Sequence, residues 1–183
     1  MTSQSPRSRF SFVNAGLLAG TTLVGLLGLS ACGGPELDSF EPVNPSVFEA
    51  ASMPACHTAL ASFDGTTAYS NGPYTGTGTS CGGVVASGYQ YQCVELVMRH
   101  FTRKWGLRWY GNAKDLLNNA PRASVDVFRN GDSAHPPVPG DMIVSGGGEM
   151  GHVALVTDVS ANEVGIIEQN VPSSYKRKLA LSN

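Results

Sequence analysis

Three side chains of this sequence have the chemistry needed to cleave an amide bond: the Cys93 thiol, the His152 imidazole and the Glu168 carboxylate. A thiolate attacks a carbonyl carbon, an imidazole takes and returns the proton, and a carboxylate holds the imidazole in one tautomer. The three residues are far apart in the sequence. This chemistry therefore requires secondary-structure elements that bring them to one place.

Cys93 is expected at the start of a helix that runs from Gln92 to Lys104. Gly- and Ser-rich chain precedes it, and apolar residues then recur at nearly helical spacing, at Cys93, Leu96, Val97, Phe101 and Trp105. Gly106 suits the end of this helix. A helix N-terminus favours a thiolate, and its backbone N–H groups can hold an oxyanion. The alternative interpretation is a buried core cysteine on the apolar face of the helix.

His152 and Glu168 are expected on the two strands of an antiparallel hairpin. Residues 152–158 and 164–170 are rich in β-branched side chains and are separated by a short turn. A three-residue turn centred on Ser160 places His152 directly opposite Glu168. Opposed Cβ atoms lie about 5 Å apart, close enough for an imidazole–carboxylate hydrogen bond. A register one residue different would put the two side chains on opposite faces.

The remaining pattern predicts an α+β fold in which N-terminal helices pack on a small antiparallel sheet. The further elements are a short helix near 55–63 within irregular chain, a second helix over 113–119 with Asn112 as its N-cap, and a strand over 141–145. Three aromatic residues lie between the two longer helices, and we expect them in the core rather than stacked on a substrate: Trp105, Trp109 and Tyr110.

Two amide side chains near the predicted site are candidates for supporting roles. Gln92 immediately precedes the nucleophile and could donate a hydrogen bond to an oxyanion. Asn170 could orient His152 if Glu168 faced elsewhere. Gly151 removes a side chain next to the histidine and so permits close backbone approach.

A metal site is the rival use of cysteine and histidine. The sequence contains no Cys-x-x-Cys and no His-Glu-x-x-His motif, and His57, His100 and His135 are scattered. We therefore expect neither a metal nor another cofactor. The net charge of −2 likewise argues against nucleic acid as a partner.

The N-terminus has the pattern of a bacterial lipoprotein signal. Arg7 and Arg9 precede an uncharged apolar run, residues 10–29, which ends in Leu29-Ser30-Ala31-Cys32-Gly33. In such a box the cysteine receives the lipid and becomes the mature N-terminus. The alternative is a plain signal-anchor helix with an incidental cysteine.

Lipid attachment at Cys32 divides the chain into three parts. Residues 1–31 are then the signal peptide, residues 32–54 a lipid-anchored linker, and residues 55–183 the catalytic domain. The lipid would hold the protein to a membrane without a spanning helix. Gly33 is not an aspartate that would retain the protein at an inner membrane. In a host with two membranes, the expected location is the periplasmic face of the outer membrane.

The proposed lipid site also helps to predict which of the four cysteines are paired and which is free. With Cys32 lipidated, three remain, and exported proteins usually pair their thiols. Cys56 and Cys81 both lie in loop-like chain before the main helix, so we expect them to form a disulfide and leave Cys93 free. The competing pair, Cys81 with Cys93, would block the chemistry.

Four boxes taken together resemble the CHAP family, the cysteine, histidine-dependent amidohydrolases/peptidases. In chain order they are Gly88-Tyr89-Gln90-Tyr91-Gln92-Cys93-Val94-Glu95, Pro139-Gly140-Asp141, Gly151-His152-Val153-Ala154 and Ile167-Glu168-Gln169-Asn170. The resemblance covers residues 82–183 and is closest to the glutathionylspermidine-amidase-like branch. It implies a papain-like α+β fold with Cys93 as nucleophile, His152 as base and Glu168 as orienting carboxylate.

The resemblance and the lipoprotein signal together predict an exported cysteine amidase or peptidase that acts on amide bonds of peptidoglycan. One alternative is an amidase for a small peptide or polyamine conjugate such as glutathionylspermidine, and another is a non-catalytic cell-envelope lipoprotein. Family members usually continue with further strands after the last box, whereas this chain ends at Asn183. A short sheet and an incomplete C-terminus both remain open.

Overall fold

The computed structural model describes residues 10–12, 54–73, 80–129, 131–171 and 175–181, all of which belong to one compact unit. The expected signal peptide and linker, including Cys32, lie outside the described residues except for Phe10–Phe12 and Pro54. In the described ranges, no helix is both long and apolar enough to span a membrane.

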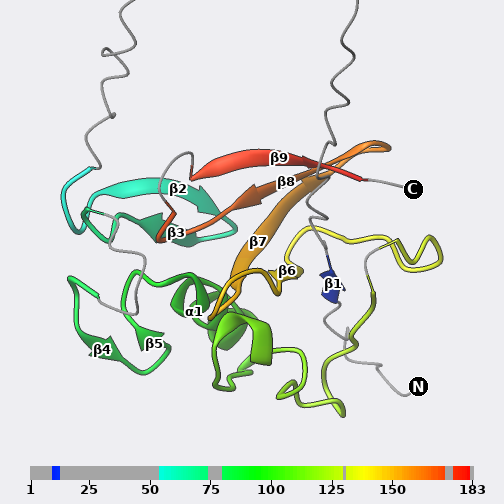
Figure 1. Cartoon of the computed structure of the whole chain (residues 1–183), viewed down its shortest axis with the longest axis horizontal. Coiled ribbons are helices and arrows are strands. Elements are labelled where there is room, and N and C mark those ends of the chain that lie inside the picture. Colours follow the sequence, from blue (N-terminus) through cyan, green and yellow to red (C-terminus); the bar gives the residue numbers. More distant parts are fainter. Residues whose placement is uncertain (1–9, 13–53, 74–79, 130, 172–174, 182–183) are drawn as a thin grey trace, which may run out of the picture. The chain divides into compact units, whose positions relative to one another are not determined.

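A five-stranded sheet forms the centre of this unit (Figure 1). In spatial order its strands are β1 (Phe10–Phe12), β6 (Met142–Ser145), β7 (His152–Val159), β8 (Glu163–Ile167) and β9 (Lys176–Ala180). The last four are antiparallel neighbours, as expected of the sheet, and β1 pairs with β6 in parallel. The sequence pattern does not predict β9, because three consecutive basic residues begin it.

The hairpin of β7 and β8 has a different register from the one expected. The paired residues nearest the turn are Val159 and Val164, whereas the expected turn would pair Asp158 with Asn162. A bulge farther along β7 then shifts the ladder by one residue. The prediction that His152 lies directly opposite Glu168 is therefore wrong, because local hydrogen bonds set turn length and bulge, and residue alternation does not reveal them.

The main helix, α1 (Cys93–Trp105), lies within one residue of its predicted bounds and packs against β7. Its apolar face is buried in a core shared with Val153 and Leu155 of β7. Gly106 follows the helix with a φ of 69°, and its N–H donates to carbonyls of the last turn. The helix and its C-terminal glycine are thus confirmed.

The second predicted helix, over 113–119, is only a single 3₁₀ turn, η1 (Ala113–Asp115). Asn112 precedes it in an extended conformation, but its side chain does not cap the turn. The Trp109 indole donates a 2.8 Å hydrogen bond to the Leu116 carbonyl, a group that a longer helix would use. The helix prediction is wrong here because this buried tertiary contact competes with the helical hydrogen bonds, so the predicted set of N-terminal helices reduces to α1 and η1 in the described chain.

Two small hairpins precede α1 where the sequence predicts a short helix and irregular chain. Their strands are β2 (Ala59–Phe63) with β3 (Thr66–Tyr69), and β4 (Val84–Val85) with β5 (Gly88–Tyr89). Asp64 and Gly65 join the first pair with positive φ angles of 43° and 70°. Asp-Gly is a preferred two-residue hairpin turn, and it explains why the helix expected near 55–63 is wrong.

The three aromatic residues at the end of α1 and just after it do not share one environment. Trp109 is buried in the core, and Trp105 packs partly buried against the same cluster. Tyr110 is 62% exposed. The core assignment is therefore confirmed for the tryptophans and wrong for Tyr110, because the chain turns outward once Trp109 is anchored.

Candidate active site

Cys93 is the first residue of α1 and lines a cleft of about 900 Å³. Gln92 before it is extended, so the helix starts at a position where backbone N–H groups lack acceptors within the helix. Cys56 and Cys81 form a disulfide, whereas Cys93 is free and partly buried. The thiol that the sequence singles out is therefore unpaired, at a helix N-terminus and beside a cleft.

His152 opens β7 and donates a hydrogen bond from Nε2 to Oε2 of Glu168 at 2.8 Å. The Glu168 side chain is buried, whereas that of His152 is 27% exposed. Burial lowers the pKa of His152, but hydrogen bonds and charges of Cys93 and Glu168 outweigh burial and raise the pKa to about 9. Because Nε2 is committed to Glu168, Nδ1 is the ring nitrogen available to the Cys93 sulfur.

Arg177 on β9 is a member of the site that the sequence analysis missed. Its Nε donates to Oε1 of Glu168, and its Nη2 donates to Oε2 at 3.2 Å. Burial raises the pKa of Glu168, but the hydrogen bonds from His152 and Arg177 outweigh it and hold the pKa below its usual value. The only hint of this role in the sequence is that Arg177 is a basic residue soon after Glu168-Gln169-Asn170.

The two amide residues expected near the site contact each other. Asn170 donates from Nδ2 to Oε1 of Gln92 at 2.8 Å, and its Oδ1 accepts from Nδ2 of Asn71 at 3.0 Å. Glu168, not Asn170, is bonded to His152. The structure thus places Gln92 on the cleft beside the thiol and ties Asn170 to Gln92 rather than to the histidine.

Two further residues of the motifs, Glu95 and Gln169, belong to a buried polar cluster at the start of α1. Both are nearly inaccessible, and Gln169 donates from Nε2 to the Gln92 carbonyl at 3.0 Å and to Glu95 at 3.2 Å. Glu95 also accepts from Arg99 at 2.7 Å, and Gln169 accepts from the Tyr69 N–H at 2.8 Å. The cluster joins α1 to β3 and to the segment after β8, so it fixes the helix start relative to the sheet.

Gly151 controls how the chain enters β7. It has a φ of 72°, and a Cβ there would lie 2.7 Å from both the Lys114 nitrogen and the Ser145 carbonyl oxygen. Only glycine fits this conformation and this space without displacing backbone. The close approach expected from the sequence is present, and it sets the position of the next residue, His152.

The cleft beside Cys93 has walls from separate parts of the chain. They are the β4–β5 hairpin, the start of α1, residues 108–113 with Asp115, and Met150 with Gly151. Arg108 donates to the Ala86 carbonyl at 2.9 Å and so joins two of these walls. The exposed apolar and aromatic side chains that line the cleft are Val84, Val85, Tyr89, Tyr110 and Met150.

The remaining histidines are engaged separately. His57 contacts the Tyr91 hydroxyl, His100 pairs with Thr66 at 2.9 Å, and His135 pairs with Asp132 at 2.9 Å. Within the described part of the chain, no group of three or more His, Cys, Asp or Glu residues is arranged to hold a metal ion.

Comparison with known proteins gives two findings. The model of the CHAP domain matches residues 84–170. Endolysin PlyTW of Staphylococcus phage Twort (strain DSM 17442 / HER 48) is 32% identical over 115 residues, which is 57% of this chain. The match covers 24% of that endolysin, so this chain corresponds to a minor part of its length.

The free thiol at a helix start, the imidazole at a strand start and the buried carboxylate all fall inside the matched range. Residues 84–170, which include Cys93, His152 and Glu168, match the CHAP domain.

Proposed function

We propose that this protein is a cysteine-dependent amidase or peptidase that cleaves amide bonds of peptidoglycan, with Cys93, His152 and Glu168 as its catalytic residues. The observation that carries this proposal is the 2.8 Å hydrogen bond of His152 to the buried Glu168 carboxylate, together with a free Cys93 thiol that helps to raise the pKa of His152. A free cysteine with an oriented imidazole is the arrangement that nucleophilic catalysis requires.

The reaction has two steps. The Cys93 sulfur attacks the amide carbonyl carbon, and the oxyanion accepts hydrogen bonds from the Cys93 N–H and from Gln92. The protonated His152 then gives its proton to the departing amine as the carbon–nitrogen bond breaks. His152 next takes a proton from water, which attacks the thioester and releases the acid and the thiol.

Glu168 supports both steps without reacting itself. It accepts the Nε2–H of His152, which fixes the ring, and Arg177 keeps the carboxylate ionised. An ionised carboxylate favours the imidazolium form, which is consistent with the pKa of His152 near 9.

The substrate class is supported by the endolysin relative and by the form of the cleft. The cleft is large and rimmed by exposed apolar side chains, which suits a peptide attached to a larger polymer better than a small enclosed ligand. The candidate bonds for cleavage are the amide between sugar and peptide and the peptide bonds within the stem peptide of peptidoglycan.

The test is digestion of purified peptidoglycan with the domain, followed by mass spectrometry of the released fragments. We expect new amine and carboxyl ends from the wild-type domain and none from Cys93→Ala. Release by Cys93→Ala would disprove the mechanism. Glutathionylspermidine serves as a second substrate, and faster turnover of it than of muropeptides would favour the small-conjugate amidase instead.

We also propose that the chain is an exported lipoprotein anchored through Cys32 at the cell envelope, with the outer membrane as its place in a two-membrane host. The Leu29-Ser30-Ala31-Cys32 box after an uncharged run supports this. Labelling with radioactive palmitate is expected for the wild type and not for Cys32→Ala. Equal labelling of the two would rule out Cys32 as the lipid site.

A further inference from the structure

The cleft beside Cys93 is lined by two side chains of opposite charge. Of the described residues around it, only Arg108 and Asp115 are charged, and most of the others are apolar, aromatic or glycine. The two charged side chains do not form an ion pair with each other in the described chain. A cleft that presents a separate cation and anion is complementary to a ligand that carries both charges.

The Asp115 side chain has no partner among the residues that the structure describes. Its backbone N–H donates to the Asn112 carbonyl at 2.9 Å, and its own carbonyl accepts from the Asn119 N–H at 3.0 Å. No hydrogen bond or ion pair with a described residue engages its carboxylate, although the residue is partly buried. Such a carboxylate is free to accept a charge-assisted hydrogen bond from an ammonium group of a ligand.

Asp115 has a fixed position relative to His152. It is the last residue of η1, and the N–H of Lys114 before it donates to the Met150 carbonyl at 3.1 Å. A Cβ at Gly151 would lie 2.7 Å from the same Lys114 nitrogen, which shows how closely η1 approaches the chain that enters β7. A ligand bound at Asp115 therefore has a defined distance from the reacting groups.

The Arg108 guanidinium uses only part of its hydrogen-bonding capacity. Its Nη1 donates to the Ala86 carbonyl at 2.9 Å, and its central carbon lies 5.7 Å from the centroid of the Tyr110 ring. Its Nε and Nη2 donate to no other described residue. Because a guanidinium has a planar fork of N–H donors that matches a carboxylate, Arg108 can bind a carboxylate of a ligand without leaving Ala86.

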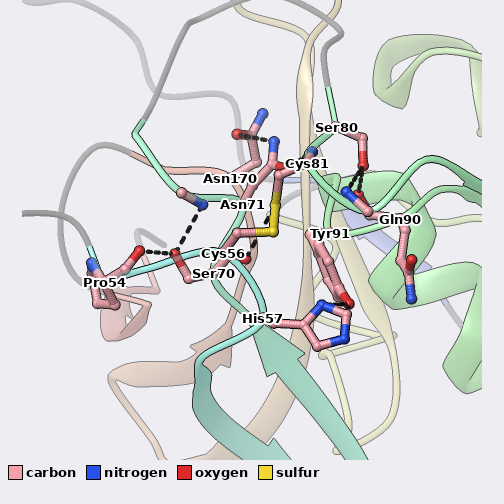
Figure 2. Close-up of a disulfide and its surroundings, with 12 residues drawn as sticks. Pro54, Cys56, His57, Ser70, Asn71, Ser80, Cys81, Gln90, Tyr91 and Asn170 are labelled. Atoms are coloured by element: carbon pink, nitrogen blue, oxygen red, sulfur yellow. Dashed lines mark hydrogen bonds between the residues drawn. A yellow bond between two sulfur atoms is a disulfide. The ribbon is translucent and has the colours of Figure 1, made fainter.

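The β4–β5 hairpin that carries Ala86 is held at its base as well as by Arg108. The Ser80 hydroxyl, just before the hairpin, donates to the Gln90 carbonyl just after it. Figure 2 shows this hydrogen bond together with the Cys56–Cys81 disulfide, which ties the same chain to the segment before β2. A guanidinium bonded to a fixed carbonyl loses little further freedom when a ligand binds, so the site is preorganised.

We propose that Asp115 and Arg108 are specificity-determining residues that bind, respectively, an ammonium group and a carboxylate group of the substrate. The substrate is then an amphoteric peptide that keeps one free amine and one free carboxylate. Stem peptides whose diamino acid is not cross-linked carry both groups, whereas cross-linking turns the amine into a neutral amide. This inference rests on the proposed function and adds to it a preference for stem peptides that are not cross-linked.

The role of Asp115 is tested with a muropeptide that is not cross-linked and with the same muropeptide acetylated at its free amine. For the wild-type domain, kcat/KM is expected to be about 10-fold higher for the free amine, as for gain of one hydrogen bond to a charged group. Asp115→Asn keeps the shape of the side chain but not its charge. It should cleave both muropeptides at the rate of the acetylated one, mainly through a raised KM.

The role of Arg108 is tested in the same way with a muropeptide whose carboxylates are converted to amides. The wild-type domain should prefer the carboxylate form about 10-fold. Arg108→Gln keeps an N–H donor for the Ala86 carbonyl and removes the charge, so it should lose this preference and retain the preference for the free amine. Asp115→Asn should show the reverse. A merely structural defect would lower all rates alike and leave both preferences in place.

Binding to the Cys93→Ala variant gives a readout that needs no turnover. Calorimetry should show the free-amine muropeptide binding about 10-fold more tightly than the acetylated one, and adding Asp115→Asn should remove the difference. Glu163→Gln, which removes an exposed carboxylate paired with Lys178, is the charge-matched control and should keep both preferences.

The outcomes separate this inference from the proposed function. Equal cleavage and equal binding of the free-amine and acetylated muropeptides by the wild-type site overturn the inference and leave the proposed function in place. A preference for the free amine that survives in Asp115→Asn, or a preference for the carboxylate that survives in Arg108→Gln, also overturns it. Selective binding without cleavage of any muropeptide would instead support the inference and contradict the proposed reaction.

Discussion

His152 and Glu168 share a hydrogen bond although neither is the other's partner in the strand ladder. Near the turn Asp158 pairs with Gly165, but beyond the bulge Val156 pairs with Ile166. Continuing the second register places Glu168 two residues from His152 along β7 and on the same face. Without the bulge the register near the turn would put the carboxylate on the opposite face. One extra residue in β7 is thus what joins the imidazole to its carboxylate.

The titration of His152 follows from its two partners. We expect its pKa to be about 9 in the wild-type domain and lower in both Cys93→Ala and Glu168→Gln, since each variant removes a group that raises it. A raised pKa stabilises the protonated folded state, so this contribution is fully present below about pH 6.5 and is lost as pH rises through about 9. NMR titration of the ring protons measures it, and a wild-type value near 6.5 would contradict the described contacts.

Arg177 is expected to support catalysis through Glu168. Arg177→Gln removes one of the two groups that hold the pKa of Glu168 down, so activity at mildly acidic pH should fall about 10-fold as the carboxyl takes up a proton. The control is Lys178→Gln, which breaks only the ion pair with Glu163 at an exposed site. The pH profile of kcat/KM is the measurement, and matching profiles for the two variants would refute the role of Arg177.

Gly151 and Gly146 provide a matched pair of glycine substitutions. A Cβ at Gly151 meets backbone atoms on two sides and forces a residue other than glycine to a φ of 72°, whereas a Cβ at Gly146 meets nothing within 4 Å. Gly151→Ala should cost about 2 kcal/mol of stability and displace His152, with loss of activity. Gly146→Ala should change stability by less than about 0.5 kcal/mol. Urea unfolding with activity assays distinguishes them, and equal effects would contradict the described geometry.

Glu95 is expected to matter for stability more than any exposed acid. Glu95→Ala leaves Arg99 and the buried Gln169 without their shared acceptor, which should cost about 3 kcal/mol. Glu163→Ala breaks only an exposed pair with Lys178, which solvent screens, and should leave the unfolding midpoint nearly unchanged. Denaturant midpoints measure both, and a Glu95→Ala midpoint equal to that of Glu163→Ala would show that the buried cluster does not hold the helix start.

The parts of the fold that could be predicted are those where a residue pattern is compatible with only one kind of secondary structure. The apolar spacing and Gly106 determine α1, and short apolar runs that contain β-branched residues determine β6, β7 and β8. The helix over 113–119 failed because the Trp109 indole takes a carbonyl that the helix would need. β9 could not be predicted from its basic residues, since its hydrogen bonds to β8 and the pairing of Arg177 with Glu168 form only in the folded protein.

The sequence by itself determined the kinds of chemistry available: a cysteine at a helix start, a histidine at a strand start and a carboxylate within an apolar run. These three positions could be read from the spacing of nearby apolar residues, because backbone geometry and the hydrophobic effect link that spacing to helices and strands. Only the tertiary structure decided which side chains meet. The bulge in β7, the support of Glu168 by Arg177 and the assignment of Asn170 to Gln92 depend on contacts between residues distant in sequence, and no local preference encodes them.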